Sequence, residues 1–244
     1  MYGTSGRIGL AILHTDMTIE GDLRRLLSED TEIHVARVVY PAAVTAANLA
    51  IAENRIEDAL RSLLPVRPSV LAWGCTSGSF YGGRGAHAAL LERMRAVAEG
   101  IPVTTATDSL ISALQALGVS RPSIGTPYSR DINNRLVAFL ESSEVAPVAV
   151  TQLYKDEIND YELQEIDDGA VMAFIRELDR PNCDSIVVSC TGLPTARVAT
   201  VAEVAIGKPV VTSNLALLWN GWRLGRLTGR PAIHTRLLDT LDHQ

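Results

Sequence analysis

Two short cysteine motifs hold the residue types most suited to chemistry in this chain. Cys75 is followed by Thr76, and Cys190 by Thr191 and Gly192, after short β-branched runs and before polar residues typical of helix starts. A helix N-terminus offers free N–H groups and a positive dipole end, which favour a thiolate and lower its pKa. Two opposed thiols could take a proton from one face of a carbon and return one to the other, or combine nucleophilic addition with proton transfer.

The two motifs occupy matching places in two halves of the chain. Residues 69–79 read SVLAWGCTSGS and residues 184–194 read DSIVVSCTGLP. Downstream, the glycine-bounded segments 100–118 and 207–225 share a Pro-Val pair at the same offset. An internal duplication of two similar α/β lobes is the simplest explanation. The alternative is chance similarity among strand–turn–helix units. A duplication would bring the two cysteines face to face across a cleft between the lobes.

Strand-like and helix-like segments alternate along the whole chain. The segments predicted as strands are residues 7–13, 33–39, 69–74, 102–105, 123–126, 146–153, 184–189 and 209–212. The segments predicted as helices are residues 16–27, 46–64, 86–98, 109–117, 131–140, 170–178, 197–205 and 215–224. This alternation predicts parallel sheets covered by helices.

Polar side chains at the predicted strand ends are candidate substrate-binding groups, because ligands of parallel α/β sheets bind beyond the carboxyl ends of the strands. Tyr128 could donate its phenol hydrogen to a carboxylate or enediolate oxygen, or be an ordinary surface tyrosine. Asp16 could cap the following helix. If Asp16 instead faced the cleft, it would repel a dicarboxylate and attract an amine. The hydroxyls of Thr76, Ser77 and Thr191 could bind an oxyanion or cap helices.

Other sequence features argue against several kinds of site. No Cys-x-x-Cys or His-x-x-x-His spacing occurs, so we expect no metal. Neither a phosphate-binding P-loop nor a dinucleotide fingerprint is present. Cys183 has no counterpart in the other half, and we expect it to be structural. The acidic stretch 156–168 is typical of a solvated loop or short helix, and the Trp219 and Trp222 cluster of a helix core.

Composition narrows the class of protein further. The chain has 244 residues, 47% of them hydrophobic, and a net charge of −6. An acidic balance argues against nucleic-acid binding, and no apolar run reaches the roughly 20 residues that span a bilayer. Three cysteines are few and odd in number, so they indicate no disulfide framework. Residues 1–7 lack the basic and then apolar order that is typical of a signal peptide. We therefore expect a cytoplasmic globular protein without nucleic-acid or membrane partners.

The motifs AWGCTSGSFYGG (residues 72–83) and VVSCTGLPT (187–195) resemble the aspartate/glutamate racemase superfamily. Within it, the arylmalonate decarboxylase and maleate cis–trans isomerase group is most similar. RIGLAIL (7–13), ALQALGV (113–119), YSRDIN (128–133) and PVVTSN (209–214) extend the resemblance. It implies an α/β fold of two pseudo-symmetric Rossmann-like lobes, each a short parallel sheet covered by helices, with a cofactor-free active site between them. Residues 1–107 plus 213–244 would form the N-terminal lobe and 108–212 the C-terminal lobe.

The resemblance also implies residue roles. Cys75 and Cys190 match the catalytic positions. The matches to the carboxylate or enediolate-binding positions are Thr76, Ser77, Tyr128, Thr191 and Gly192. The decarboxylases typically have glycine where this chain has Cys75, and the maleate isomerases have asparagine where it has Asp16.

The presence of Cys75 favours a cofactor-independent isomerase or racemase that uses two opposed cysteines on a small carboxylate or dicarboxylate, and Asp16 leaves room for a substrate that bears an amino group. Such an enzyme would be most like maleate cis–trans isomerase, and a homodimer is the expected assembly. The alternatives are an aspartate/glutamate-type racemase, an arylmalonate-type decarboxylase and a non-catalytic carboxylate-binding protein.

Overall fold

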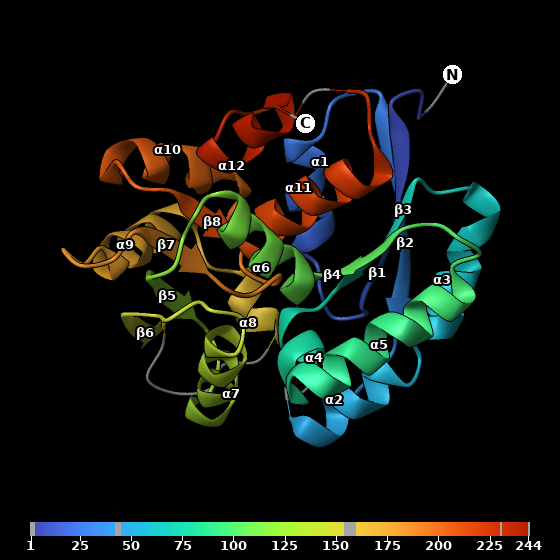
Figure 1. Cartoon of the computed structure of the whole chain (residues 1–244), viewed down its shortest axis with the longest axis horizontal. Coiled ribbons are helices and arrows are strands. Elements are labelled where there is room, and N and C mark those ends of the chain that lie inside the picture. The colour runs from blue at the N-terminus through green and yellow to red at the C-terminus, as the bar shows by residue number, and fades with distance from the viewer. Residues whose placement is uncertain (1–2, 42–44, 154–159, 230, 244) are drawn as a thin grey trace.

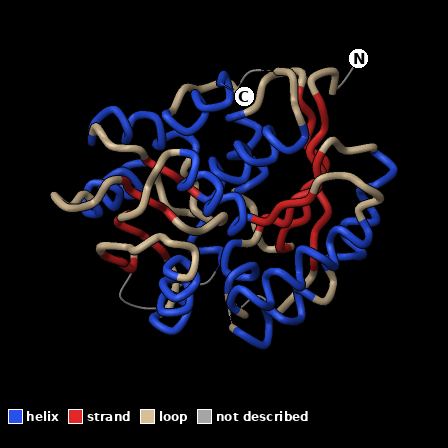
Figure 2. The backbone as a smooth tube through the Cα atoms, in the orientation of Figure 1, coloured by secondary structure: helices blue, strands red, loops and turns tan. Residues whose placement is uncertain are grey.

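The fold consists of two four-stranded parallel sheets with helices around and between them, as the sequence predicts (Figures 1 and 2). It was obtained as a computed structural model, which describes residues 3–41, 45–153, 160–229 and 231–243. In Figure 1 the first sheet lies on the right, the second on the left, and helices α6 and α11 between them. This arrangement brings the ends of two equivalent sheets together at one junction.

Both sheets have the same strand order, which is what a duplicated unit predicts. The first has the order β2-β1-β3-β4 and the second β6-β5-β7-β8, with every pair parallel. The strands are β1 (Gly6–Leu13), β2 (Thr31–Val38), β3 (Val70–Gly74), β4 (Val103–Thr105), β5 (Pro122–Thr126), β6 (Ala149–Gln152), β7 (Ser185–Val188) and β8 (Val210–Thr212). The central strands β3 and β7 are buried throughout, because helices cover both faces of the sheets.

Most of the helices follow the predicted segments. They are α1 (Ile19–Leu26), α2 (Ala46–Glu53), α3 (Ile56–Leu63), α4 (Thr76–Phe80), α5 (Gly83–Val97), α6 (Ala106–Ala116), α7 (Arg130–Glu141), α8 (Asp160–Gln164), α9 (Asp168–Leu178), α10 (Ala196–Ile206), α11 (Ser213–Gly225) and α12 (Arg236–Asp239), with short 3₁₀ turns at Leu64–Val66 and Thr240–His243. The short helix α4, directly after Cys75, was not predicted separately.

The predicted single helix 46–64 is wrong, since the chain forms α2 and α3 with a break at Asn54 and Arg55. The Arg55 guanidinium donates a hydrogen bond to the Val39 carbonyl oxygen at the break. Beyond it, α3 packs its apolar face against β1 and β2, whereas α2 turns to contact α4. One straight helix could not make both contacts.

Helices α6 and α11 join the two sheets into one core. Helix α11 packs on α6 and also contacts β1 and β3. Its first ten residues, Ser213–Trp222, are all buried, so the Trp219 and Trp222 cluster is helix core, as predicted. The same hydrophobic cluster contains Val70 of the first sheet and Val187 of the second. Because residues of both sheets pack into this one core, the positions of the two sheets relative to each other are fixed.

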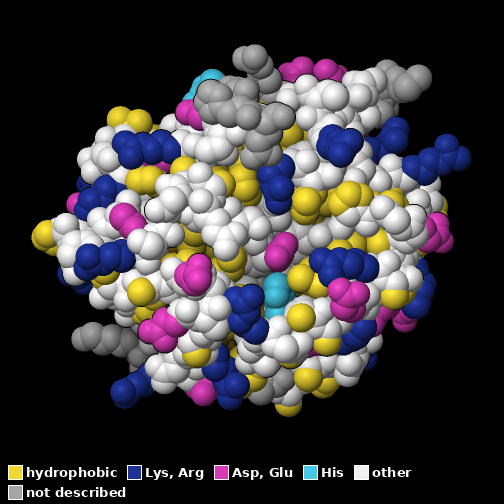
Figure 3. Space-filling view, in the orientation of Figure 1, with side chains coloured by type: hydrophobic (Ala, Val, Ile, Leu, Met, Phe, Trp, Pro, Cys, Tyr) yellow, Lys and Arg dark blue, Asp and Glu magenta, His cyan; other side chains and the backbone are white. Residues whose placement is uncertain are grey.

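The face shown in Figure 3 is mixed in charge, with Lys and Arg side chains interspersed with Asp and Glu and with hydrophobic side chains visible between them. Across the described ranges, no helix combines the length and apolar character that crossing a membrane requires.

Candidate active site

The two cysteines occupy equivalent places at the ends of β3 and β7. Cys75 is buried at the start of α4, where its Sγ accepts a hydrogen bond from the Gly78 N–H at 3.4 Å. Cys190 follows β7 and is partly exposed, and its Sγ lies close to Gly192, whose backbone N–H lowers the thiol pKa in part. The Ser77 Oγ lies 4.0 Å from the Cys75 Sγ. Each thiol therefore has one backbone N–H donor from a nearby glycine.

Hydrogen bonds connect the two cysteine motifs directly. The Thr191 hydroxyl donates to the Gly74 carbonyl oxygen at 3.3 Å, which links the residue after Cys190 to the residue before Cys75. The Thr76 hydroxyl donates to Ser213 Oγ at 3.0 Å, at the start of α11. The structure thus brings the two half-sites to the same junction between the sheets.

Tyr128 lies at this junction, where its ring packs edge-on against Phe80 of α4 with the ring centroids 5.9 Å apart. Its phenol is buried and lies within hydrogen-bonding reach of the Cys190 thiol and the Thr76 hydroxyl. The Cys75 thiol is close enough to affect it electrostatically. Burial, first of all, raises the pKa of Tyr128 well above its ordinary value, so the phenol keeps its proton at neutral pH. It is therefore a hydrogen-bond donor, not a buried anion.

The prediction that helix N-termini lower the pKa of the thiols is wrong. Burial raises the pKa of Cys75 to about 12 and also raises that of Cys190. Helix α4 has only five residues, and one N–H donor to each sulfur does not compensate for removing a thiolate from water. Asp16 and Asp160 raise both thiol pKa values further through their negative charge. Both cysteines are thus protonated at neutral pH in the unliganded chain.

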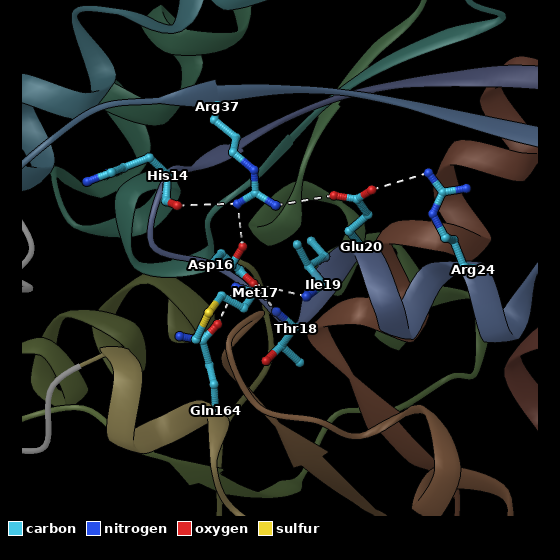
Figure 4. Close-up of polar contacts among 9 residues, drawn as sticks. All are labelled: His14, Asp16, Met17, Thr18, Ile19, Glu20, Arg24, Arg37 and Gln164. Atoms are coloured by element: carbon cyan, nitrogen blue, oxygen red, sulfur yellow. Dashed lines mark hydrogen bonds and ion pairs between the residues drawn. The ribbon is translucent and has the colours of Figure 1, made fainter.

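Asp16 caps the start of α1, which is one of the two roles considered for it, and its effect on a substrate stays a prediction. Its Oδ1 accepts hydrogen bonds from the Thr18 and Ile19 N–H groups, each at 2.9 Å, and so caps the start of α1 (Figure 4). Its carboxyl group is also within hydrogen-bonding reach of the Thr191 hydroxyl, close to both thiols. Burial is the main cause that raises the pKa of Asp16 to about 6, and the charge of Asp160 adds to it.

Asp160, on α8, is a site residue that the sequence did not reveal. Its Oδ2 accepts a hydrogen bond from the Tyr40 hydroxyl at 2.5 Å and from the Thr15 hydroxyl at 2.6 Å. Its charge affects Asp16 and both cysteines. The acidic stretch 156–168 pointed to a solvated segment, and no spacing in it distinguished Asp160 from its neighbours. The part of that stretch from 156 to 159 lies outside the described residues.

Helix α8 docks on the loop between β1 and α1. The Gln164 side chain donates to the Thr15 carbonyl oxygen at 3.0 Å and accepts from the Met17 N–H (Figure 4). Leu163 packs over Gly192, where a Cβ atom would lie 3.2 Å from Leu163 Cδ2. Helix α8, which precedes β7 in the chain, therefore holds a carboxylate against the first sheet beside the thiols.

A buried acidic residue braces the loop that follows Cys190. Asp22 of α1 accepts hydrogen bonds at its Oδ2 from the N–H groups of Thr195 and Ala196, at 2.9 and 3.0 Å, and from Asn214 Nδ2 at 3.0 Å. Asn214 Nδ2 also donates to the Thr191 carbonyl oxygen at 3.0 Å. Asn214 belongs to the PVVTSN motif, for which the sequence alone assigned no role.

Cys183 lies apart from this site. It precedes β7, at the opposite end of the strand from Cys190. It is buried, its thiol donates to the Arg180 carbonyl oxygen at 3.1 Å, and Lys208 Nζ donates to its sulfur at 3.5 Å. Within the part of the chain that the structure describes, no group of three or more His, Cys, Asp or Glu side chains is arranged to hold a metal ion.

Two like α/β lobes, with a cysteine at the same strand end in each, define the class of protein. The chain belongs to the arylmalonate decarboxylase family, whose family model matches residues 35–238.

Sequence and structural relatives include both a decarboxylase and an isomerase. The arylmalonate decarboxylase of Bordetella bronchiseptica is 35% identical over 194 residues, which cover 78% of this chain and 79% of the relative. The maleate isomerase of Nocardia farcinica (strain IFM 10152) is 26% identical over 228 residues, 86% of each chain. An isomerase or decarboxylase of this family is therefore supported.

Solved structures show the same fold over nearly the whole chain. One is a liganded arylmalonate decarboxylase variant with a glycine changed to cysteine and a cysteine changed to serine. Its TM-score is 0.86 at 28% identity, and the match covers 96% of this chain and 99% of that one. Another is a cysteine-to-serine variant of the Nocardia farcinica maleate cis–trans isomerase with a covalently bound succinylcysteine intermediate. Its TM-score is 0.85 at 25% identity, with coverage of 96% and 98%.

Proposed function

We propose that the protein is a cofactor-independent isomerase or racemase in which Cys75 and Cys190 act as a pair on a small carboxylate. The observation that carries this proposal is the equivalent placement of the two thiols at the ends of β3 and β7, with Tyr128 close to both. A single-thiol decarboxylase needs no second cysteine at the β3 end.

For a substrate with an acidic α-hydrogen, one sulfur, as thiolate, takes the α-proton and the other delivers a proton to the opposite face. The electron pair released from the C–H bond moves into the carboxylate as an enediolate. The Tyr128 phenol and the Thr76 hydroxyl are donors suited to stabilise that charge, and the N–H of Gly192 adds a backbone donor near Cys190. The Ser77 and Thr191 hydroxyls are the further substrate-binding groups of the proposal.

For a cis-enedioate, the same two sulfurs serve a different sequence of steps. The Cys75 thiolate adds to the double bond, a C–S bond forms, and Cys190 donates a proton to the neighbouring carbon. Rotation about the new single bond follows, Cys190 takes the proton back, and the electron pair expels the thiolate to give the trans isomer. The succinylcysteine intermediate of the Nocardia farcinica isomerase variant supports this route.

Decarboxylation of a substituted malonate is the second candidate, favoured by the family match and the 35% identical relative. Loss of carbon dioxide would leave an enediolate, and Cys190 beside Tyr128 would protonate it. Cys75 has no necessary role in that reaction.

NMR in heavy water distinguishes these functions. Maleate, aspartate, glutamate, hydantoins and arylmalonates are incubated with the protein. Solvent deuterium at an α-carbon without loss of carbon dioxide indicates racemisation, a trans alkene indicates cis–trans isomerisation, and release of carbon dioxide indicates decarboxylation. Thermal stabilisation by a carboxylate without any turnover would instead indicate a binding protein and refute the proposal.

Three variants test the two-thiol mechanism. Cys75→Ala and Cys190→Ala are each expected to lose at least about a thousandfold in kcat, because either acid or base is missing. Cys183→Ala is the matched control, since that thiol lies at the other end of β7, and it is expected to keep wild-type turnover. Full activity of either site variant would contradict the proposal.

The homodimer and the cytoplasmic location stay predictions, as do the lobe boundaries of residues 1–107 with 213–244 and 108–212. Light scattering of the purified protein measures its oligomeric state and so tests the homodimer.

A further inference from the structure

Two carboxylates approach the thiols from different parts of the fold. Asp16 comes from the loop after β1, and Asp160 from α8 before β7. The loop after β1 lies at the same edge of the first sheet as Cys75, because Ile12 of β1 is opposite Gly74 of β3, and Asp160 accepts a hydrogen bond from Thr15 of that loop. The charges of both carboxylates also act on both thiols. The sequence pointed only to Asp16. The tertiary structure brings Asp160 to the same place.

Hydrogen bonds hold both carboxylates in place without neutralising them. Asp160 Oδ2 accepts from the hydroxyls of Tyr40 and Thr15, and Asp16 Oδ1 accepts from two backbone N–H groups. All of these donors are uncharged. The charges are therefore positioned but not cancelled.

Arg37 lies beside Asp16 in Figure 4, but its guanidinium does not pair with the Asp16 carboxylate. Arg37 donates to the backbone carbonyl oxygens of His14 and Asp16, at 3.3 and 2.7 Å, and forms an ion pair with Glu20 at 3.2 Å (Figure 4). Within the described residues, neither the Asp16 nor the Asp160 carboxylate is paired with a Lys, Arg or His side chain. A substrate therefore meets two negative charges beside the reacting sulfurs.

We propose that Asp16 and Asp160 make this active site selective for carboxylates that also bear a cationic group, such as an α-ammonium, and against dicarboxylates. The inference rests on the proposed function, because it names the substrate class of the same two-thiol site.

The expected size of the effect follows from Coulomb's law. Two unit charges about 6 Å apart, at an effective dielectric constant of about 40, change a binding equilibrium about tenfold. A second substrate carboxylate is disfavoured by about that factor for each aspartate, and an ammonium group is favoured by it. An ammonium group would also offset the two aspartate charges, which add to the effect of burial on the thiol pKa values, and would so help to form the thiolate that the reaction requires.

Alkylation with charge-matched reagents measures this selectivity without any substrate turnover. The thiols are labelled with iodoacetate, iodoacetamide or 2-bromoethylamine at one pH and low ionic strength, and rates at Cys75 and Cys190 are followed by mass spectrometry. Taking the ratio of two reagents on one variant cancels changes in thiolate fraction. In Asp160→Asn, the iodoacetate-to-iodoacetamide ratio is expected to rise about tenfold and the bromoethylamine-to-iodoacetamide ratio to fall similarly.

Two further variants complete the experiment. Asp16→Asn is expected to shift the ratios in the same direction as Asp160→Asn, which covers the case in which one variant folds poorly. Glu165→Gln is the matched control, because it removes an exposed carboxylate directly after α8, and it is expected to change the ratios less than twofold. Unchanged ratios in both aspartate variants would overturn the inference.

Substrate turnover separates failure of the inference from failure of the proposed function. The wild type is expected to have a higher kcat/KM for an amino acid than for the matched dicarboxylate, and Asp160→Asn is expected to narrow that difference about tenfold. A wild type that prefers maleate overturns the charge selectivity but leaves the two-thiol function intact. Shifted alkylation ratios without turnover of any carboxylate refute the proposed function and support the charge selectivity.

Discussion

Replacing Asp22 by alanine tests whether the brace between α1 and the loop after Cys190 stabilises the fold. In the wild type, Asp22 Oδ2 accepts from the N–H groups of Thr195 and Ala196 and from Asn214 Nδ2. Asp22 is 5% exposed, so water cannot readily take its place in the intact structure. The Thr195 hydroxyl donates to the same oxygen at 3.3 Å, so alanine would leave four buried donors without this acceptor.

The expected cost follows from those unsatisfied donors. Each hydrogen bond to a charged acceptor contributes about 1.5 to 3 kcal/mol, and the burial that raises the pKa of Asp22 offsets part of the sum. We expect Asp22→Ala to lower the free energy of unfolding by about 3 to 4 kcal/mol. Asp22→Asn keeps an acceptor oxygen of the same shape and is expected to lose about 1 to 2 kcal/mol.

Urea unfolding followed by circular dichroism provides the measurement. For a chain of this size, 3 to 4 kcal/mol corresponds to a fall in Tm of about 10 °C, which differential scanning calorimetry can check. Glu20→Ala is the matched control, because Glu20 lies on the same helix and forms partly exposed ion pairs with Arg24 and Arg37. It is expected to lose less than about 1 kcal/mol.

Two outcomes would refute this reasoning. An Asp22→Ala protein within about 1 kcal/mol of the wild type would show that other groups or water satisfy the four donors. Equal losses for Asp22→Ala and Glu20→Ala would show that helix α1 responds to any removed carboxylate, whatever its burial.

Three further predictions concern the thiol, the pH response and the packing of the second sheet. In Gly78→Ala, the added methyl group lies 2.9 Å from Cys75 Sγ, so kcat/KM is expected to fall at least about tenfold in steady-state assays while Tm changes by only a few degrees. The pKa of Asp16 rises from 3.8 to about 6 on folding, so the native state binds the proton more tightly, and the wild type loses up to about 3 kcal/mol as pH rises from about 4 to 6. Urea titrations should show that Asp16→Asn lacks this loss, with a constant difference from wild type above about pH 7. In Gly125→Ala, the methyl group lies 2.5 Å from Phe174 Cε1, and urea unfolding should show a loss of about 1 to 3 kcal/mol.

The sequence predicted most of the sheet because buried strands leave a local signal. Apart from Arg7, residues 7–13 and 123–126 are apolar or small, and both segments lie within β1 and β5 as formed. The repeated order of Cys, Thr and Gly predicted that Cys75 and Cys190 occupy equivalent strand ends, and both do. The break between α2 and α3 was missed, because contacts of each helix with different neighbours override a continuous helical pattern.

The sequence by itself therefore determined the α/β class, the repeat and the pair of cysteines, because periodicity and motif spacing are properties of neighbouring residues. Only the tertiary structure decided which other groups surround the thiols. Asp160 reaches Tyr40 across 120 positions of sequence, and Asp22 reaches Asn214 across 192. The raised pKa of both thiols has the same origin, since burial depends on what the whole chain packs around a side chain.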